Sequence, residues 1–384
     1  MNRRNSFTIP NASVHDPVHV LVSGGVDSSV ALARLRAAGY TDIRAYYLKI
    51  WLEDDLSSLG DCPWEDDLSY ARSVCEQCDV PLRVIPLQLE YHNLVVEYTL
   101  AELRAGRTPS PDIFCNQRVK FGAFLNHLRE PGWVASGHYA QIVRSGSEVH
   151  LYRAPDPVKD QTYFLSHMSQ EQLSRLVFPV GDLPKGEVRR IAEDMKLATM
   201  SRPDSQGICF LGKIRYPEFV RHYLGDSPGD IVERETGTVL GTHRGFWFHT
   251  IGQRQGLGLG NGPWYVTGKD TRANIVYVSH ARHVAEAATS TLHLTGFNWI
   301  GSRPADGRFG VKLRHGPQIT ACSIQVDSSA EGTVLVELDA PDRGAAPGQF
   351  AILYDGERCL GGGMINGSGE PESCLVKEAN TCVS

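Results

Sequence analysis

The chain contains no apolar run long enough to cross a membrane. Hydrophobic residues make up 41% of the sequence, but none of their runs approaches the roughly 18 residues that a spanning helix needs. Near the N-terminus, Arg3, Arg4 and Ser6 precede the first acidic residue, Asp16, and no apolar signal core accompanies them. We therefore expect a protein with no membrane partner that works in the cytoplasm. A short targeting segment would instead direct it to a plastid or a mitochondrion.

Two further compositional signals are missing: an excess of basic residues and a paired set of cysteines. The 38 Lys and Arg residues are outnumbered by 44 Asp and Glu residues, which gives a net charge of −6. A nucleic-acid partner would therefore have to meet a local basic patch, because the protein is not basic overall. The nine cysteines are odd in number and scattered along 384 residues, which indicates reduced thiols rather than a disulfide framework.

The most informative motif is a glycine-rich loop without a lysine. It comprises Leu21, Val22, Ser23, Gly24, Gly25, Val26, Asp27, Ser28 and Ser29. The loop joins an apolar strand-like run to a helical stretch, so backbone amides and a helix N-terminus can bind an anion, and Asp27 offers Mg²⁺ an oxygen ligand. Because the lysine of GxxxxGK[ST] is absent, the loop is not that of γ-phosphate-transferring enzymes. The pattern SGGxDSS resembles instead the pyrophosphate loop of enzymes that split ATP into AMP and pyrophosphate.

Strands and helices alternate in the first part of the chain. The pattern predicts strands at 18–22, 44–50, 82–87 and 133–137, with helices at 68–78, 90–105 and 116–128. This alternation is typical of an α/β fold with a doubly wound parallel sheet, which binds ligands at the carboxyl ends of its strands. The glycine-rich loop and residues 136–139 both follow such ends.

The pattern changes at about residue 216, where Gly, Pro and Thr become frequent and helical periodicity disappears. Short strands are expected at 245–250, 275–278, 333–338 and 350–354. We therefore expect three domains: a catalytic domain at 1–215, a central β-containing module at 216–283 and a C-terminal β-barrel at 284–384.

Two cysteines lie in segments suited to chemistry. Cys115 follows two prolines at a predicted helix start, where a helix N-terminus favours the thiolate. Cys209 lies in the turn-rich loop 204–210 rather than on an apolar face. A cysteine alone is more often a small buried hydrophobe than a catalyst, so the surrounding motifs decide the interpretation.

Those motifs resemble the tRNA-specific 2-thiouridylases over nearly the whole chain. Besides the glycine-rich loop, the matching blocks are 106–109, 111–116, 120–121, 137–139, 159–165, 204–210, 251–258 and 347–349. The resemblance implies a pyrophosphate-loop, adenine-nucleotide α-hydrolase-like domain followed by two small β-rich domains, the last a β-barrel. It also implies the use of ATP and Mg²⁺ to activate the C2 carbonyl of the wobble uridine. The expected partners are tRNA, bound through its anticodon arm, and a persulfide sulfur-donor protein. The protein is expected to be a monomer.

The same resemblance assigns roles to the reactive residues. Cys209 would carry a persulfide, and Cys115 would be the nucleophile that releases its sulfur through a transient Cys115–Cys209 disulfide, or would assist attack on the base. Asp112, together with Ser110 and Pro111, would meet the target base. Leu48 and Gly137 would line the adenosine pocket. The implied tRNA contacts are His138, Lys159, Asp160, Gln161, Arg314, His315 and Gln349. Ser110 and His315 depart from the family's usual Asn and Tyr.

Other interpretations use the same residues. An iron–sulfur cluster on Asp112, Cys115 and Cys209 is the rival to the persulfide. An amide-forming ATP pyrophosphatase that adenylates a carboxylate is the rival activity, and a non-catalytic RNA-binding protein is a third possibility. The Cys75–Cys78 CxxC pair has no second pair to complete a zinc site. The glycine-rich segment 256–262 lacks dinucleotide-loop spacing, so a turn or a tRNA contact is expected there.

Overall fold

The computed structural model describes residues 6–51, 64–204, 214–285, 288–326 and 332–366. Its first part is built on a five-stranded parallel sheet with the order β3-β2-β1-β4-β7. The strands are β1 (Val18–Leu21), β2 (Ile43–Lys49), β3 (Leu82–Pro86), β4 (Trp133–Ala135) and β7 (Leu176–Val177). The expected doubly wound sheet is confirmed.

Helices cover both faces of this sheet because the strand side chains alternate between two apolar clusters. Val18 and Val20 of β1 pack in one cluster with α1 (Val26–Ala37), α3 (Trp64–Gln77) and α10 (Lys185–Asp194). Leu21 belongs to the other cluster. That cluster includes residues of α4 (Gln88–Tyr91), η3 (His92–Val96), α5 (Glu97–Arg104), α6 (Pro111–Phe114), η4 (Cys115–Ala123) and α7 (Phe124–His127). Two predicted helices, 90–105 and 116–128, thus lie on the same side of the sheet. No helix in the described part of the chain is both long and apolar enough to span a bilayer.

Both of these helices contain π-helical segments, η3 and η4. Wide turns leave backbone carbonyls without their usual intrahelical partners, and side chains supply the missing donors. Gln172 Nε2 donates to the carbonyls of Gln117 at 2.8 Å and Phe121 at 2.6 Å, and Arg118 donates to the carbonyl of Leu94 at 3.1 Å. Such segments are frequent at functional sites, and η4 begins at a candidate catalytic residue.

The middle module contains a four-stranded sheet with the order β10-β11-β8-β9. Its elements are α11 (Tyr216–Leu224), β8 (Gly229–Glu233), β9 (Val239–His243), η5 (Phe246–Phe248), β10 (Trp264–Asp270) and β11 (Ile275–His280). The predicted strand at 245–250 is wrong, since η5 is a short 3-10 helix there. Phe248 N donates to Gly245 O and His249 N to Phe246 O, which closes turns within the segment. A short aromatic run cannot distinguish a strand from such a turn.

The third part is a six-stranded antiparallel barrel that is closed by pairing between β12 and β17. Its strands are β12 (Thr289–Trp299), β13 (Gly307–Lys312), β14 (Thr320–Val326), β15 (Val334–Asp342), β16 (Phe350–Asp355) and β17 (Arg358–Ile365). The expected barrel is confirmed. Its sheet continues into a hairpin of the first domain, β5 (Ala140–Ser145) and β6 (Glu148–Arg153), through β17. The predicted domain boundaries at 215 and 283 stay predictions.

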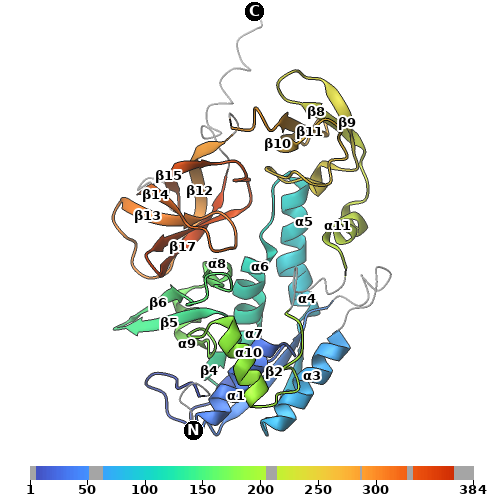
Figure 1. Ribbon diagram of the computed structural model, residues 1–384. Coiled ribbons are helices and arrows are strands. Elements are labelled where there is room, and N and C mark those ends of the chain that lie inside the picture. The colour runs from blue at the N-terminus through green and yellow to red at the C-terminus, as the bar shows by residue number, and fades with distance from the viewer. Residues whose placement is uncertain (1–5, 52–63, 205–213, 286–287, 327–331, 367–384) are drawn as a thin grey trace, which may run out of the picture.

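The segment that follows α5 lies at a junction of all three parts. Thr108 N donates to Pro347 O of the barrel at 2.8 Å, and the Thr108 hydroxyl lies 3.4 Å from that of Thr250 in the middle module. Gly348 has φ of +88°, and a Cβ there would lie 2.8 Å from Thr108 O, so this close approach requires glycine. Figure 1 shows the barrel beside the β5–β6 hairpin and the middle module near the far end of α5.

Candidate active site

The glycine-rich loop connects β1 to α1, as predicted. Gly24 has φ of +77°, and a Cβ there would lie 2.1 Å from the backbone oxygen of Asp67, so only glycine fits. The Ser28 hydroxyl accepts a hydrogen bond from Ser23 N at 3.2 Å and donates one to Gly25 O at 3.1 Å. These contacts fix the loop at the N-terminus of α1, where free N–H groups and the helix dipole favour an anion.

The two residues predicted to line the adenosine pocket lie on strands that flank β1. Leu48 is near the carboxyl end of β2, and Gly137 follows the end of β4. A Cβ on Gly137 would lie 2.6 Å from the backbone nitrogen of Ser28, so the segment after β4 packs directly on the start of α1. The loop, Leu48 and Gly137 therefore meet at the carboxyl edge of the sheet, where ligands bind in this class of fold.

Asp27, in the first turn of α1, belongs to a polar network that the motif alone does not reveal. Its Oδ1 accepts hydrogen bonds from Tyr139 Oη at 2.7 Å and from Lys185 Nζ at 2.6 Å. Lys185 also contacts Asp204 at 2.9 Å, and Lys159 binds the same carboxylate at 2.6 Å. Burial alone would raise the pKa of Asp204, but the hydrogen bonds from Lys159 and Lys185 outweigh it and lower that pKa well below the ordinary value. Sequence reasoning missed Lys185, since it belongs to none of the motifs.

The chemistry of the loop fits a magnesium ion that arrives with a nucleotide. The carboxylate of Asp27 is one ligand of the kind that Mg²⁺ prefers. Across the five described ranges, no three His, Cys, Asp or Glu side chains come together in a group that could hold a metal ion. Magnesium at this loop would therefore take its other ligands from phosphates and water, as it commonly does in ATP-using enzymes.

The second motif forms the beginning of a helix that runs through α6, η4 and α7. Ser110 is its N-cap residue, and Pro111 takes the first helical position, where no N–H is needed. Asp112 follows in the first turn. Burial raises the pKa of the Asp112 carboxyl, and the charge of Lys120 offsets part of this effect. Asp112 is consequently a stronger proton acceptor than an exposed aspartate.

Cys115 lies further into this helix than the sequence suggested. It is the fifth residue after the N-cap Ser110, and it is only 1% exposed. It packs in the same cluster as Phe114 and Val119. Because the helix dipole acts mainly within the first turn, it favours the thiolate of Cys115 less than a position at the N-terminus would. The expectation of a thiol at the helix N-terminus is corrected accordingly.

Cys209 lies outside the described residues, in the range 205–213. The disulfide between Cys115 and Cys209 therefore stays a prediction, as does the cluster on Asp112, Cys115 and Cys209. Asp204, which pairs with Lys159, Lys185 and Arg189, is the last described residue before this range.

Lys120 and His138 lie between the second motif and the phosphate loop and influence each other electrostatically. The charge of Lys120 acts on both Asp112 and His138. The His138 ring packs against Phe121 and Phe178 at centroid distances of 5.6 and 5.7 Å. Burial, followed by the charge of Lys120, lowers the pKa of His138 to about 3, so this imidazole is neutral at physiological pH. A neutral His138 would contact RNA by stacking or hydrogen bonding rather than by charge.

The predicted tRNA-contact segment 159–161 combines side chains of very different exposure. Lys159 is partly exposed, although its ammonium is paired with Asp204. Gln161 Oε1 accepts a hydrogen bond from Tyr139 N at 3.0 Å. The Asp160 carboxylate, by contrast, has no exposed surface and is 2.7 Å from the equally buried Lys312 Nζ of the barrel. Its side chain therefore has a structural role in this conformation and presents no surface to an RNA.

The remaining predicted tRNA contacts lie on the barrel. His315 Nε2 is 3.1 Å from Asp160 O, and its ring stacks on Phe164 with centroids 4.7 Å apart. Arg314 is exposed and paired with Asp342 at 2.6 Å. Arg314 and Gln349 line a cleft of about 610 Å³ between the barrel and the middle module. The cleft is also lined by Thr250, Ile251, Gly252, Tyr265, Pro341, Asp342, Arg343 and Gly344. Of these, only Ile251 and Gly252 belong to one of the motif blocks.

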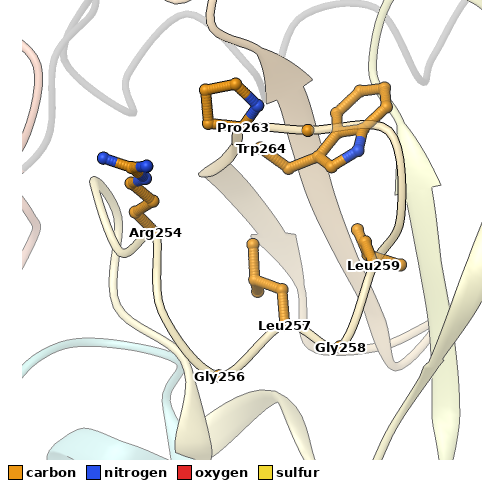
Figure 2. A pocket seen from close by; sticks show the side chains of 8 residues that line it. Arg254, Gly256, Leu257, Gly258, Leu259, Pro263 and Trp264 are labelled. Carbon is orange, nitrogen blue, oxygen red and sulfur yellow. The ribbon is translucent and has the colours of Figure 1, made fainter.

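The CxxC pair and the glycine-rich segment 256–262 both have structural explanations. Cys75 and Cys78 are both buried in the α3 side of the core, and burial raises the pKa of Cys75 to about 12, which disfavours the thiolate that a metal requires. The glycine-rich segment at 256–262 leads into strand β10 rather than a helix. It borders a hollow of about 330 Å³ between Arg254 and Trp264, as Figure 2 shows.

A parallel sheet with a lysine-free phosphate loop at its carboxyl edge, followed by two β-rich modules, defines a nucleotide-binding enzyme of the HUP class. The chain matches three consecutive family models: the tRNA methyl transferase HUP domain over 16–213, the tRNA methyl transferase PRC-barrel domain over 217–280 and the aminomethyltransferase beta-barrel domain over 289–365. The tRNA-specific 2-thiouridylase MnmA of Parabacteroides distasonis is 43% identical over 361 residues, which cover 91% of this chain and 98% of that protein. MnmA of Geobacillus thermodenitrificans is 40% identical over 361 residues, covering 93% and 96%. The chain belongs to the tRNA-specific 2-thiouridylase family.

Among solved structures, the U34-tRNA thiolase NcsA from Methanococcus maripaludis with its [4Fe-4S] cluster aligns at 14% identity and a TM-score of 0.34, covering 54% of this chain and 65% of that one. A likeness of this degree has no bearing on the mechanism.

Proposed function

We propose that the protein uses ATP to replace the C2 oxygen of the wobble uridine of tRNA with sulfur. Membership of the 2-thiouridylase family is the observation that carries this proposal. The arrangement of the site supports it. Gly137 packs on the start of α1 at the phosphate loop, and the adjacent His138 packs on Phe121 of the helix that bears Asp112 and Cys115. The rival amide-forming ligase would need neither that thiol nor two β-rich modules.

The first step is adenylation of the base. The O2 oxygen of uridine attacks the α-phosphorus of ATP, the bond to pyrophosphate breaks, and pyrophosphate leaves with the bonding electrons. Asp112, with its raised pKa, accepts the proton from N3 of the base. The C2 oxygen thereby becomes part of AMP, a good leaving group.

The second step transfers sulfur. The terminal sulfur of a Cys209 persulfide attacks C2, and AMP leaves. The Cys115 thiolate then attacks Sγ of Cys209, the sulfur–sulfur bond breaks, and the transferred sulfur remains on C2. A Cys115–Cys209 disulfide forms and is reduced by an external thiol. A separate persulfide-carrying protein would reload Cys209.

The cleft between the barrel and the middle module is our candidate surface for tRNA. Arg314, Arg343 and Tyr265 give it two cations and an aromatic ring, the side chains that recognise phosphates and unpaired bases. The wobble base would be flipped into the site as the anticodon arm binds. We further propose that the protein works as a monomer in the cytoplasm.

Reconstitution tests the reaction. Purified protein, tRNA, ATP, Mg²⁺ and a persulfide donor should yield 2-thiouridine at the wobble position, with one AMP and one pyrophosphate for each thiolated base. Nucleoside mass spectrometry and product assays measure all three. Pyrophosphate exchange driven by a small carboxylic acid in the absence of tRNA would instead support the amide-forming ligase and contradict this proposal.

The thiols are tested separately. Protein purified without oxygen should contain no iron, and a persulfide donor should add one sulfur to the peptide that carries Cys209. The Cys115→Ser variant should keep this sulfur but fail to deliver it, Cys209→Ser should never acquire it, and the control Cys78→Ala should behave as the wild type. Stoichiometric iron and sulfide that are lost in either active-site variant would establish the cluster mechanism instead.

A further inference from the structure

The phosphate loop contains no cationic side chain, although its ligand is strongly anionic. The loop offers backbone N–H groups and hydroxyls. Adenylation releases pyrophosphate, on which negative charge grows as the bond to the α-phosphorus breaks. Fixed positive groups at the position of developing charge lower such barriers strongly. A cation from elsewhere in the chain would therefore add to the charge that Mg²⁺ supplies at the phosphates.

Lys185 is placed to supply it. It is the first residue of α10, and its side chain is 13% exposed. Its Nζ lies 2.6 Å from Asp27 Oδ1 and 2.9 Å from Asp204 Oδ1, and 5.8 Å from the centre of the Tyr139 ring. An ammonium group has three N–H donors, and two of them are accounted for by these carboxylates among the described residues. The ammonium is thus held at the loop with one donor directed elsewhere.

Arg202, another cation near the loop, has a different role. Its Nη1 donates to Gly24 O at 2.8 Å and its Nη2 to Asp67 Oδ1 at 2.7 Å. The guanidinium thus holds the backbone of the loop against α3. Arg202 shapes the loop, whereas Lys185 faces the carboxylate at the start of α1.

We propose that Lys185 binds the phosphates of ATP and stabilises the departing pyrophosphate, a role that rests on the proposed use of ATP at this loop. Lys185 acts only by donating hydrogen bonds, so no proton or electron is exchanged with it. The lysine that the motif lacks is in this way supplied from a position 158 residues away from Asp27. Asp27 and Asp204 orient the ammonium before the nucleotide binds, which reduces the reorganisation needed at reaction.

Binding experiments without tRNA test this role. The Lys185→Met variant should bind the non-hydrolysable α,β-methylene analogue of ATP at least ten-fold more weakly than the wild type, while AMP binding changes less than two-fold. Lys185→Arg should recover part of the loss. Arg190→Ala is the matched control, because Arg190 is an exposed cation on the same helix that pairs with Glu187, and it should leave both affinities unchanged. Calorimetry measures all of these affinities on the full chain.

Turnover provides a second measurement. At saturating ATP, Lys185→Met should lower the rate of tRNA-dependent pyrophosphate release on the order of 10²-fold, the effect typical of removing one donor to developing charge. Equal loss of ATP and AMP affinity together with a lower Tm would show a purely structural residue and overturn the inference, as would wild-type turnover. Failure of the wild type to thiolate tRNA would contradict the proposed function. The affinities of Lys185→Met for the ATP analogue and for AMP would still test the role of Lys185 in that case.

Discussion

At the scale of single residues, the buried pair of Asp160 and Lys312 shows that a sequence motif can mark a residue as important without showing which partner it contacts. The motif marks Asp160 as important, and the resemblance placed it at the tRNA. In the structure its carboxylate contacts Lys312 and the Thr162 hydroxyl, and both charged side chains are 0% exposed. The two partners are 152 residues apart in sequence, so no local pattern could have revealed the pair.

Removal of one partner from this pair should be strongly destabilising. Lys312→Met removes the fully buried cation from the Asp160 carboxylate and leaves it only the longer contact with Arg153 at 3.4 Å. We expect the free energy of unfolding to fall by about 3 kcal/mol, the lower end of the range for breaking a buried ion pair. The double variant Asp160→Asn/Lys312→Met removes both charges and should regain more than half of that loss. Urea denaturation measures both values.

An exposed pair on the same barrel is the control. Arg314→Met breaks the contact with Asp342, and solvent screening should limit the change to about 0–1 kcal/mol. If Lys312→Met were no more destabilising than Arg314→Met, the buried pair would contribute little to stability.

At the scale of elements, the sequence located most strands and helices but not their finer geometry. Apolar runs correctly predicted four strands of the parallel sheet, β1 to β4, and the signal is strongest for β1, which is buried along its whole length. The two-residue strand β7 was too short to be predicted. The π-helical turns of η4 had no such signal. Gly122 is compatible with them, since a Cβ there would lie 2.7 Å from Gln117 O. Gln172, which donates to two carbonyls of η4, comes from α9 (Gln170–Arg175) on a later part of the chain.

Gln172 should therefore support both stability and catalysis. We expect Gln172→Ala to reduce the free energy of unfolding by about 1–3 kcal/mol, because buried carbonyls lose their donor. Since η4 begins at Cys115, the change should also lower kcat for thiolation measured under conditions where the protein is fully folded.

Ser169→Ala separates these effects. Ser169 caps α9 and donates nothing to η4, so this variant should lose about 0.5–2 kcal/mol of stability while keeping the wild-type kcat. Equal kcat values for the two variants would mean that the side-chain donor to η4 does not position the thiol.

At the scale of the whole molecule, an acidic protein is proposed to bind a polyanion through a limited surface. The net charge of −6 and the exposed cations of the cleft are compatible because phosphate contacts are local. Composition alone would not have indicated RNA, and the cleft itself is formed by two modules whose relative placement a sequence does not show. Tyr265 and Arg343 come from these two modules.

Binding of tRNA should accordingly weaken steeply with salt. We expect Arg343→Ala to reduce the slope of log affinity against log salt by about one, the contribution of one phosphate contact. Arg308→Ala should leave the slope unchanged, since Arg308 pairs with Asp339 and does not line the cleft. Filter binding over a range of salt concentrations measures the slopes, and a salt-independent wild type would argue against a phosphate-binding surface.

The contact between Thr108 and the barrel has a consequence for the order of events during protein synthesis. Thr108 immediately precedes the segment that carries Asp112 and Cys115, yet its backbone partner, Pro347, is made almost 240 residues later. The ribosome must therefore add all of these residues before the segment that leads into the helix with Asp112 and Cys115 gains this contact. A nascent chain that already holds the phosphate loop and both candidate thiols would still lack this contact between the first domain and the barrel.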